Sequence, residues 1–245
     1  MNPTKSKVAA INTVTIIGCG GVASYLLPAL LRTFKVNRVV LHDGDTLEER
    51  NLDRQLFSSE HIGMNKAEAQ AILLRAQFPR IDFDVVPEYF SDGSYLEPWS
   101  TVLVCVDNHA ARANALRVAD QNDCVVVIAG NEYTDAQSMI YLRQWQGTTF
   151  DPRVRYPDIL TDQSDDPRRP ESCQGALQQA HPQLAMANFS AANHALWLLW
   201  FWKMERDKLD PDVAALFSPV EHSNNFNRFR TKMSGDFAKK AEVAA

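Results

Sequence analysis

The segment Gly18-Cys19-Gly20-Gly21-Val22-Ala23 decides the fold of this chain. It follows an apolar run at residues 14–17 and leads into residues 22–34, which are predicted to form a helix with apolar residues on several faces. A strand, a G-x-G-x-x-A turn and a helix in this order are typical of nucleotide-binding folds, because the glycines let backbone N–H groups approach phosphate oxygens. A glycine-rich turn without a ligand is the alternative.

The rest of the first half alternates strands with helices. Predicted strands cover residues 38–42, 82–86, 101–106 and 124–129, and predicted helices cover residues 64–78 and 109–121. This alternation predicts the α/β class, as a Rossmann-like, mostly parallel sheet with helices on both faces.

The second half has a different pattern. A strand is predicted at residues 137–144, a long polar loop at 147–170 and an apolar helix at 183–208. Residues 1–13 are predicted to be a poorly ordered arm, and the Lys/Ala-rich end of residues 217–245 is predicted to be a frayed tail. We expect a single domain over residues 1–245. In it, residues 14–144 form the nucleotide-binding core, 145–182 a crossover loop, and 183–232 a C-terminal helix and partner or dimer region.

Composition excludes several classes of protein. The chain has 245 residues, of which 45% are hydrophobic, and a net charge of -5, so a nucleic-acid surface is not expected. Its four cysteines form no C-x-x-C pair, which argues against structural zinc and disulfides and favours a reducing cytoplasm. The longest apolar run, residues 195–202, is too short to span a bilayer, and the N-terminus lacks the apolar core of a signal peptide.

Carboxylates follow two of the predicted strands. Asp43, which Asp45 follows closely, lies where a carboxylate accepts hydrogen bonds from ribose hydroxyls of either NAD or ATP; a surface turn is the alternative. Asp107 ends another strand, where a carboxylate can hold Mg²⁺. Asp107 or its neighbour Asn108 could also cap the helix that follows.

Cationic and amide side chains then favour ATP over NAD. Asn51, Arg54, Gln55 and Lys66 follow the second strand, and a reaction that expels pyrophosphate needs cations to stabilise the charge on the leaving phosphates. A dehydrogenase has no such need. For each of these residues alone, a solvent-exposed position remains the alternative.

Five motifs in order resemble the ThiF/MoeB superfamily, whose members are adenylating enzymes related to ubiquitin-activating enzyme. The motifs are Gly18–Ala23, Asp43-x-Asp45, Asn51-Leu52-Asp53-Arg54-Gln55, Gly63-x-x-Lys66 and Val106-Asp107-Asn108-x-x-x-Arg112. The resemblance covers residues 14–143, and more weakly 173–202. In its compact size and C-terminal half the chain is most similar to the ThiF-related protein of bacterial PRTRC cassettes, which also encode a small ubiquitin-like protein.

The resemblance implies ATP- and Mg²⁺-dependent adenylation of the C-terminal glycine carboxylate of a small ubiquitin-like protein by a homodimeric enzyme. Asp43 would hold the ribose, Asn51, Arg54 and Lys66 would face the phosphates, and Asp107 would hold Mg²⁺. The implied nucleotide-binding residues are Gly18, Gly20, Gly21, Asp43, Asp45, Asn51, Arg54, Gln55, Lys66, Asp107 and Asn108. The implied catalytic residues are Arg54, Lys66, Asp107 and Cys173.

Cys173 is the candidate acyl acceptor. It lies at the end of the polar loop, and in the superfamily a cysteine in this region can attack the adenylate to form a thioester; Arg168 and Arg169 could lower its pKa. A surface cysteine without a role is the alternative. Cys19, Cys105 and Cys124 are predicted to be buried and inert.

The chain departs from the family in two respects. It lacks the two zinc-binding C-x-x-C pairs, and only Lys5 and Lys7 stand where the sulfur-carrier activators have an arginine that reaches the partner subunit. Three alternatives stay open: an adenylating dehydratase acting on a small molecule or tRNA base, a non-catalytic subunit that binds a ubiquitin-like protein, and an NAD-dependent dehydrogenase.

Overall fold

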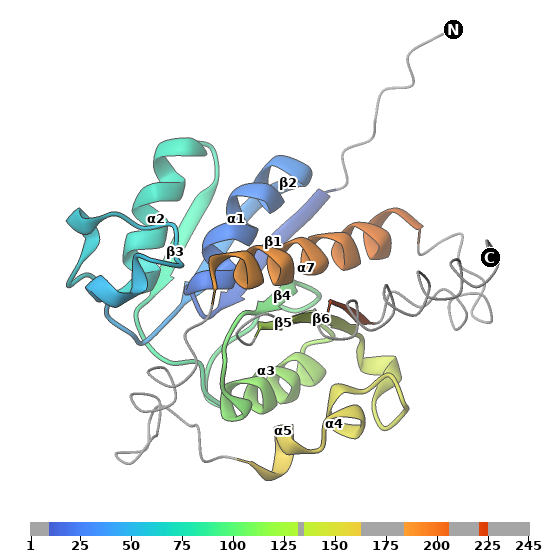
Figure 1. Cartoon of the computed structure of the whole chain (residues 1–245). Coiled ribbons are helices and arrows are strands. Elements are labelled where there is room, and N and C mark those ends of the chain that lie inside the picture. Colours follow the sequence, from blue (N-terminus) through green and yellow to red (C-terminus); the bar gives the residue numbers. More distant parts are fainter. Residues whose placement is uncertain (1–9, 132–134, 163–183, 206–220, 225–245) are drawn as a thin grey trace, which may run out of the picture.

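A seven-stranded sheet with helices on both faces forms the body of the protein (Figure 1). The computed structural model describes residues 10–131, 135–162, 184–205 and 221–224. The strands are β1 (Ala10–Ile17), β2 (Lys35–His42), β3 (Asp82–Val86), β4 (Thr101–Val104), β5 (Val125–Asn131), β6 (Ala136–Tyr141) and β7 (Glu221–Asn224). The helices are α1 (Gly21–Thr33), α2 (Lys66–Gln77), α3 (His109–Gln121), α4 (Pro152–Arg155), α5 (Asp158–Thr161) and α7 (Ala185–Glu205), with 3₁₀ turns η1 (Glu49–Asn51), η2 (Ser59–His61) and η3 (Arg143–Trp145).

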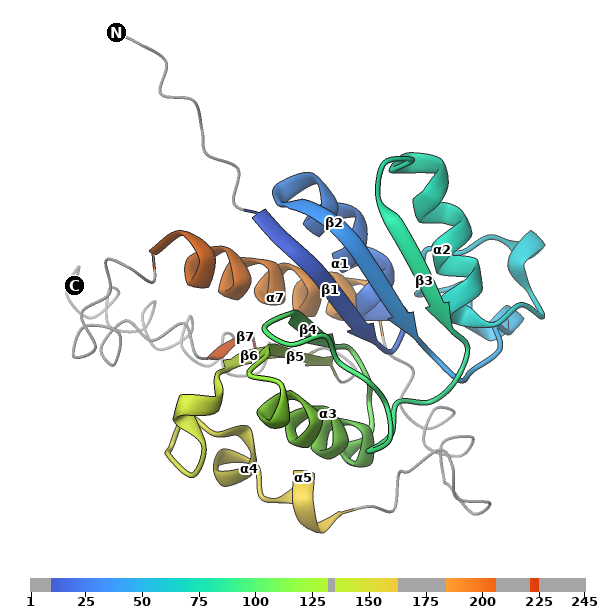
Figure 2. The same ribbon diagram turned by 180° about the vertical axis from the view of Figure 1, so that it is seen from behind.

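The sheet order is β3-β2-β1-β4-β5-β6-β7. The first five strands are parallel, β6 pairs antiparallel with β5, and β7 pairs antiparallel with β6. Ile17 at the end of β1 pairs with His42 at the end of β2 and with Val104 at the end of β4. The carboxyl ends of these three strands therefore meet, as Figure 2 shows from behind. This arrangement confirms the predicted Rossmann-like, mostly parallel fold.

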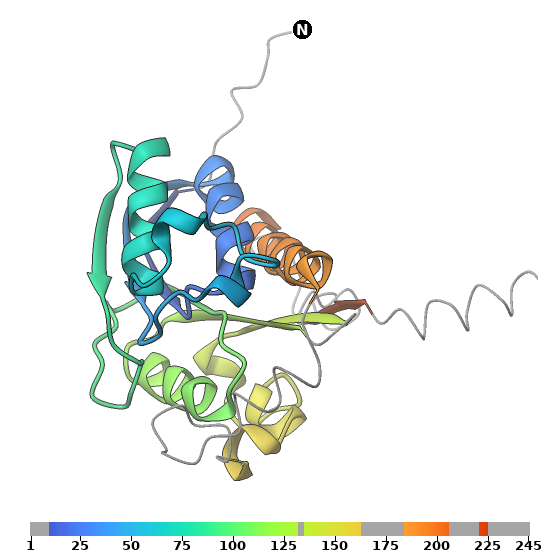
Figure 3. The same cartoon turned by 60° about the vertical axis from the view of Figure 1, so that its left-hand side comes forward.

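Each face of the sheet has its own helical layer (Figure 3). Helices α1, α2 and α7 cover one face, where Leu27, Leu30 and Ala191 are fully buried in one apolar cluster. Helices α3 and α5 cover the other face, where Leu116 and Ile159 belong to a second cluster. α7 packs along α1 and reaches β5 and β6, so the last described helix lies beside the first.

Two sequence-based predictions about loops were wrong. Residues 10–13 belong to β1 rather than to a loose arm, because Ile11 and Thr13 are buried. α4 and α5 lie inside the stretch 147–170, where a loop was expected. β7 lies near the start of residues 217–245, of which only the Lys/Ala-rich end was predicted to be frayed, and it pairs with β6. The remainder of the predicted crossover loop, with Cys173, lies outside the described residues.

The segment that carries α4 is fixed by a charged cluster. Arg153 lies 2.7 Å from Asp120 Oδ2 and 2.8 Å from Asp151 Oδ1, and it donates to the Tyr141 hydroxyl at 2.6 Å. Asp151 also caps α4 by accepting from the Arg153 backbone N–H, and Pro152 occupies the first turn, where a missing N–H costs nothing. Side chains from α3, β6 and α4 thus meet around one guanidinium.

Within the described ranges, no helix combines the length and apolar character needed to cross a membrane. The expected cytoplasmic location stays a prediction.

Candidate active site

A cavity opens at the carboxyl edge of the sheet, and all eleven predicted nucleotide-binding residues line it. They come from the β1–α1 turn, the segment after β2, the start of α2 and the segment after β4. The other lining residues are Ile17, Val22, His42, Tyr89, Phe90, Cys105, Val106, Ala111, Ala129, Gly130, Asn131 and Asn188. Their roles toward a ligand stay predictions, but the structure brings the predicted set together.

The glycine turn lets β1 approach β4 closely. Gly18 has a φ of +90°, and a Cβ there would lie 2.8 Å from Val106 Cγ1 and 2.9 Å from the Cys105 carbonyl oxygen. Glycine is required at this position for both its conformation and its space. Gly20 is covered by the Gln55 amide, whose Nε2 would lie 3.7 Å from a Cβ on Gly20. Gly18, Gly20 and Gly21 all line the cavity, so the backbone of the turn lies at its wall, where a close approach to an anion is possible.

Asp43 is a buried aspartate that holds the turn together. Its Oδ2 accepts from the Cys19 N–H at 2.7 Å and its Oδ1 from the Asp45 N–H at 2.8 Å. Burial raises the pKa of Asp43 to about 6, although Lys66 acts in the opposite direction. The alternative of a surface aspartate was wrong, because the residue is only 8% exposed.

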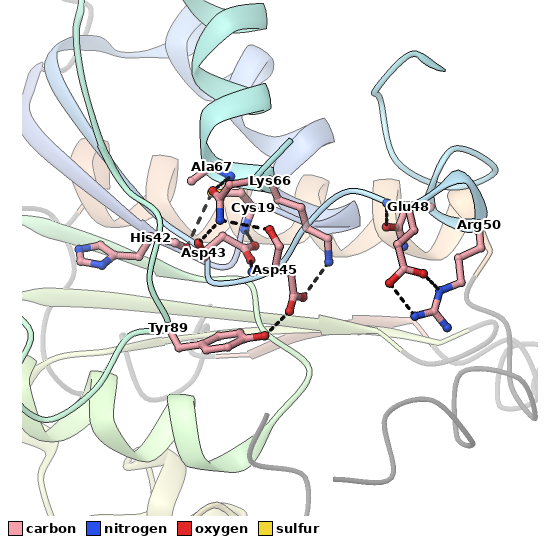
Figure 4. Close-up of polar contacts among 11 residues, drawn as sticks. Cys19, His42, Asp43, Asp45, Glu48, Arg50, Lys66, Ala67 and Tyr89 are labelled. Carbon is pink, nitrogen blue, oxygen red and sulfur yellow. Dashed lines mark hydrogen bonds and ion pairs between the residues drawn. The ribbon is translucent and has the colours of Figure 1, made fainter. Parts of the chain in front are cut away.

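Asp45 lies between a lysine and a tyrosine (Figure 4). Lys66 Nζ is 2.8 Å from Asp45 Oδ2, and the Tyr89 hydroxyl donates to Asp45 Oδ1. Burial alone would lower the pKa of Lys66, but Asp43, Asp45 and Asp107 together raise it. Lys66 is therefore a fixed cation inside the cavity, which contradicts the solvent-exposed alternative.

Arg54 is a second cation at the cavity wall. Its side chain is 10% exposed, and Nη1 donates to the Arg50 carbonyl at 2.7 Å and to Asp53 Oδ1 at 2.8 Å. A guanidinium has five N–H donors, so its remaining edge can bind phosphate oxygens. The turn that presents it is fixed by Asn51, whose Oδ1 accepts from the Glu48 N–H at 3.0 Å. The solvent-exposed alternative was wrong for Arg54 as well.

Asp107 and Asn108 have different roles at the end of β4. Asn108 is buried and caps α3 by accepting from the Ala111 N–H at 2.8 Å, which confirms the helix-cap alternative. Asp107 is exposed at the cavity. No group of three or more metal-ligating side chains was found among the described residues. A single carboxylate still fits Mg²⁺, because this ion is commonly held by one or two carboxylates together with substrate phosphates.

Sequence reasoning missed three cavity residues. His42 ends β2 and Tyr89 follows the end of β3 by three residues, so their positions near the carboxyl edge were a usable signal. Burial lowers the pKa of His42 to about 4, so its imidazole is neutral at physiological pH. Asn188 lies in α7 and is 1% exposed. A buried amide in an otherwise apolar helix was the available signal.

The described cysteines are poorly suited to covalent chemistry. Cys19 and Cys124 are buried, as predicted, and Cys105 is half-buried in the cavity wall. Burial raises the pKa of the Cys105 thiol to about 12 and also raises the pKa of Cys19 and Cys124, so the reactive thiolate is disfavoured at all three positions.

The sheet and its carboxyl-edge cavity define a Rossmann-like α/β protein. Residues 4–231 match the ThiF family, and the chain belongs to that family. Among curated proteins, it is similar to ubiquitin-like modifier-activating enzyme 5 of Drosophila pseudoobscura pseudoobscura, with 32% identity over 128 residues, 46% of this chain and 32% of that protein. The enzyme of the same name from Aedes aegypti is 30% identical over 115 residues, covering 41% of this chain and 29% of that protein. The matches thus span about a third of those relatives.

Solved structures share the fold. Escherichia coli MccB with ATP superposes with a TM-score of 0.57 at 20% identity, over 78% of this chain and 55% of that chain. PaaA superposes with a TM-score of 0.55 at 19% identity, over 78% of this chain and 63% of that chain. At these identities the likeness extends to the fold alone.

Proposed function

We propose that this protein is an ATP-dependent adenylating enzyme that activates the C-terminal glycine carboxylate of a small ubiquitin-like protein. The observation that carries the proposal is the single cavity where the glycine turn, Asp43, Arg54, Lys66 and Asp107 meet. Membership of the ThiF family and the likeness to enzymes named for activating ubiquitin-like modifiers support it.

The charges of the cavity suit a triphosphate. The backbone N–H groups of Gly20 and Gly21 lie at the start of α1, where the helix dipole favours an anion. Asp43 provides carboxylate oxygens for ribose hydroxyls, and each oxygen that accepts one backbone N–H retains a further lone pair. Arg54 and Lys66 supply positive charge for the phosphates.

In the proposed reaction, a carboxylate oxygen of the substrate attacks the α-phosphorus of ATP. The bond between that phosphorus and the oxygen bridging to the β-phosphate breaks, and pyrophosphate leaves with the electron pair. Arg54 and Lys66 stabilise the charge that grows on the leaving group. A Mg²⁺ ion bound with the triphosphate would neutralise part of that charge, and Asp107 would hold it.

Several finer predictions belong to the same proposal. Residues 1–245 form one adenylation domain, in which residues 14–144 bind the nucleotide, 145–182 cross over and 183–232 serve the partner or a homodimer. Cys173 accepts the activated acyl group. The narrower resemblance to the ThiF-related protein of PRTRC cassettes selects the small ubiquitin-like protein encoded beside it as the first substrate to try.

The test is ATP–pyrophosphate exchange with that small protein. Arg54→Ala and Asp107→Ala should each abolish partner-dependent exchange. The matched controls are Arg117→Ala and Asp92→Ala, since these side chains form an exposed ion pair with each other. A partner that lacks its terminal glycine should not support exchange. Exchange that is unchanged in Arg54→Ala, or that needs a small molecule or tRNA instead of a protein, would contradict the proposal.

A further inference from the structure

Asn188 connects the last described helix to the two segments that face the phosphates. It lies in the first turn of α7 and is 1% exposed. Its Nδ2 donates to the Arg54 carbonyl oxygen at 3.2 Å, across 134 residues of sequence. Burying an amide costs free energy unless it forms hydrogen bonds, so this contact is the reason that α7 can carry an asparagine among its buried alanines.

The same amide covers the start of α1. A Cβ on Gly21 would lie 2.4 Å from Asn188 Nδ2, so the asparagine occupies the space that a side chain would need. Gly21 is the first residue of α1 and lacks the left-handed conformation of Gly18. An alanine at position 21 would therefore clash with the Asn188 side chain, whereas the backbone conformation there would accept it.

From these contacts we propose that Asn188 is a positioning residue that holds Arg54 against the phosphate end of the cavity. The inference rests on the proposed function, because it assumes that Arg54 contacts the leaving phosphates of ATP. Within its own turn, the Arg54 N–H donates to the Asn51 carbonyl at 3.3 Å. Two side chains from other elements also hold this backbone: Ser24 Oγ accepts from the Leu56 N–H at 3.1 Å, and Asn188 donates to the carbonyl of Arg54 itself.

The fold should survive the loss of this amide. α7 is also held where Ser138 Oγ donates to the Ala191 carbonyl at 3.0 Å and where Phe189 packs edge-on against Tyr25. Asn188→Ala should therefore affect the position of Arg54 more than the docking of α7. The matched control is Asn193→Ala, the same substitution at an exposed position of the same helix.

The experiment measures binding of ATP and of AMP to the full chain, with thermal unfolding as a check on folding. We expect Asn188→Ala to weaken ATP binding about 5- to 10-fold, as the loss of one buried hydrogen bond predicts, and AMP binding less than about 2-fold. A purely structural role would weaken both nucleotides equally. Asn193→Ala should change neither.

A double-mutant cycle tests the steric contact independently. Gly21→Ala should weaken ATP binding by displacing Asn188. The double variant, which carries both Gly21→Ala and Asn188→Ala, should bind ATP no more weakly than the single variant with the lower affinity. Additive effects, or equal losses for ATP and AMP, would overturn the inference. If the wild type binds ATP but shows no partner-dependent exchange, the proposed substrate is wrong and the role of Asn188 can still be measured. If the wild type does not bind ATP, both the proposed function and this inference are wrong.

Discussion

Lys66 and Asp45 form an ion pair of 2.8 Å inside the cavity, and the Tyr89 hydroxyl occupies the other oxygen of the same carboxylate. The Tyr89 ring lies over Gly44, where a Cβ would be 2.6 Å from the ring atoms. The tyrosine therefore orients Asp45, and Asp45 holds the lysine. Under the proposed function, Lys66 would exchange part of this contact for phosphate oxygens when a triphosphate enters.

Removal of the Tyr89 hydroxyl should loosen this chain of contacts. A hydrogen bond to a charged group is worth about 1.5–3 kcal/mol when it is buried, but Tyr89 is partly exposed, so the loss of its hydroxyl should cost less. We therefore expect Tyr89→Phe to lower ATP–pyrophosphate exchange about 3- to 10-fold. Tyr95→Phe is the matched control, since Tyr95 is 71% exposed. An equal loss in both variants would contradict this role of Tyr89.

The pKa of Asp43 predicts a pH dependence of the stability of the nucleotide-free protein. Burial raises this pKa to about 6 from 3.8, so the native state binds the proton more tightly than the unfolded state does. The group therefore adds stability as the pH falls from 7 towards 4, by up to about 3 kcal/mol, and this contribution is lost as the pH rises through 6. The measurement is chemical unfolding of the wild type and Asp43→Asn at several pH values. A difference between the two that does not vary with pH would contradict the assignment.

Nucleotide binding should respond to pH in the opposite direction. A carboxylate that accepts ribose hydroxyls must be ionised, so ATP affinity should fall below pH 6 as Asp43 takes up its proton. Titration of ATP affinity between pH 5 and 8, with Asp43→Asn as the comparison, checks this. The variant should bind weakly and without this pH dependence.

Arg153 should be among the most sensitive positions for stability. Arg153→Ala would leave Asp120 and Asp151 buried without their cation, and breaking a buried pair in this way costs about 3–5 kcal/mol. The control is Arg143→Ala, whose partner Asp123 forms an exposed pair and for which about 0–1 kcal/mol is expected. Urea unfolding measures the free energy of unfolding of both variants. Equal losses of stability in Arg153→Ala and Arg143→Ala would show that the burial of the ion pair does not determine its contribution.

Cys173 can be tested without any structural description of its surroundings. Cys173→Ala should retain ATP–pyrophosphate exchange but lose a reducible conjugate with the partner, since only the thiol is removed. Cys124→Ala is the control and should retain the conjugate, because burial raises the pKa of that thiol. A conjugate that persists in Cys173→Ala would exclude Cys173 as the acceptor.

Local sequence was enough to predict the fold and eleven of the 23 residues that line the cavity. Parallel strands that alternate with helices place the residues after each strand at one edge, so Gly18, Asp43 and Asp107 had to approach one another. The predicted helix at residues 109–121 has the bounds of α3, because Asn108 is a local cap. Such features depend on neighbours in the chain and can be derived from them.

Contacts between distant segments were decided only by the tertiary structure. The pairing of Lys66 with Asp45, the place of Tyr89 and the reach of Asn188 to Arg54 depend on how whole elements pack. The helices α4 and α5 were missed for the same reason: each has only four residues, and Arg153 fixes the first of them through charges on α3. The sequence by itself therefore determined the fold and which residues meet at the edge of the sheet. Packing decided which of those side chains hold one another in place, because that depends on distances that no local pattern encodes.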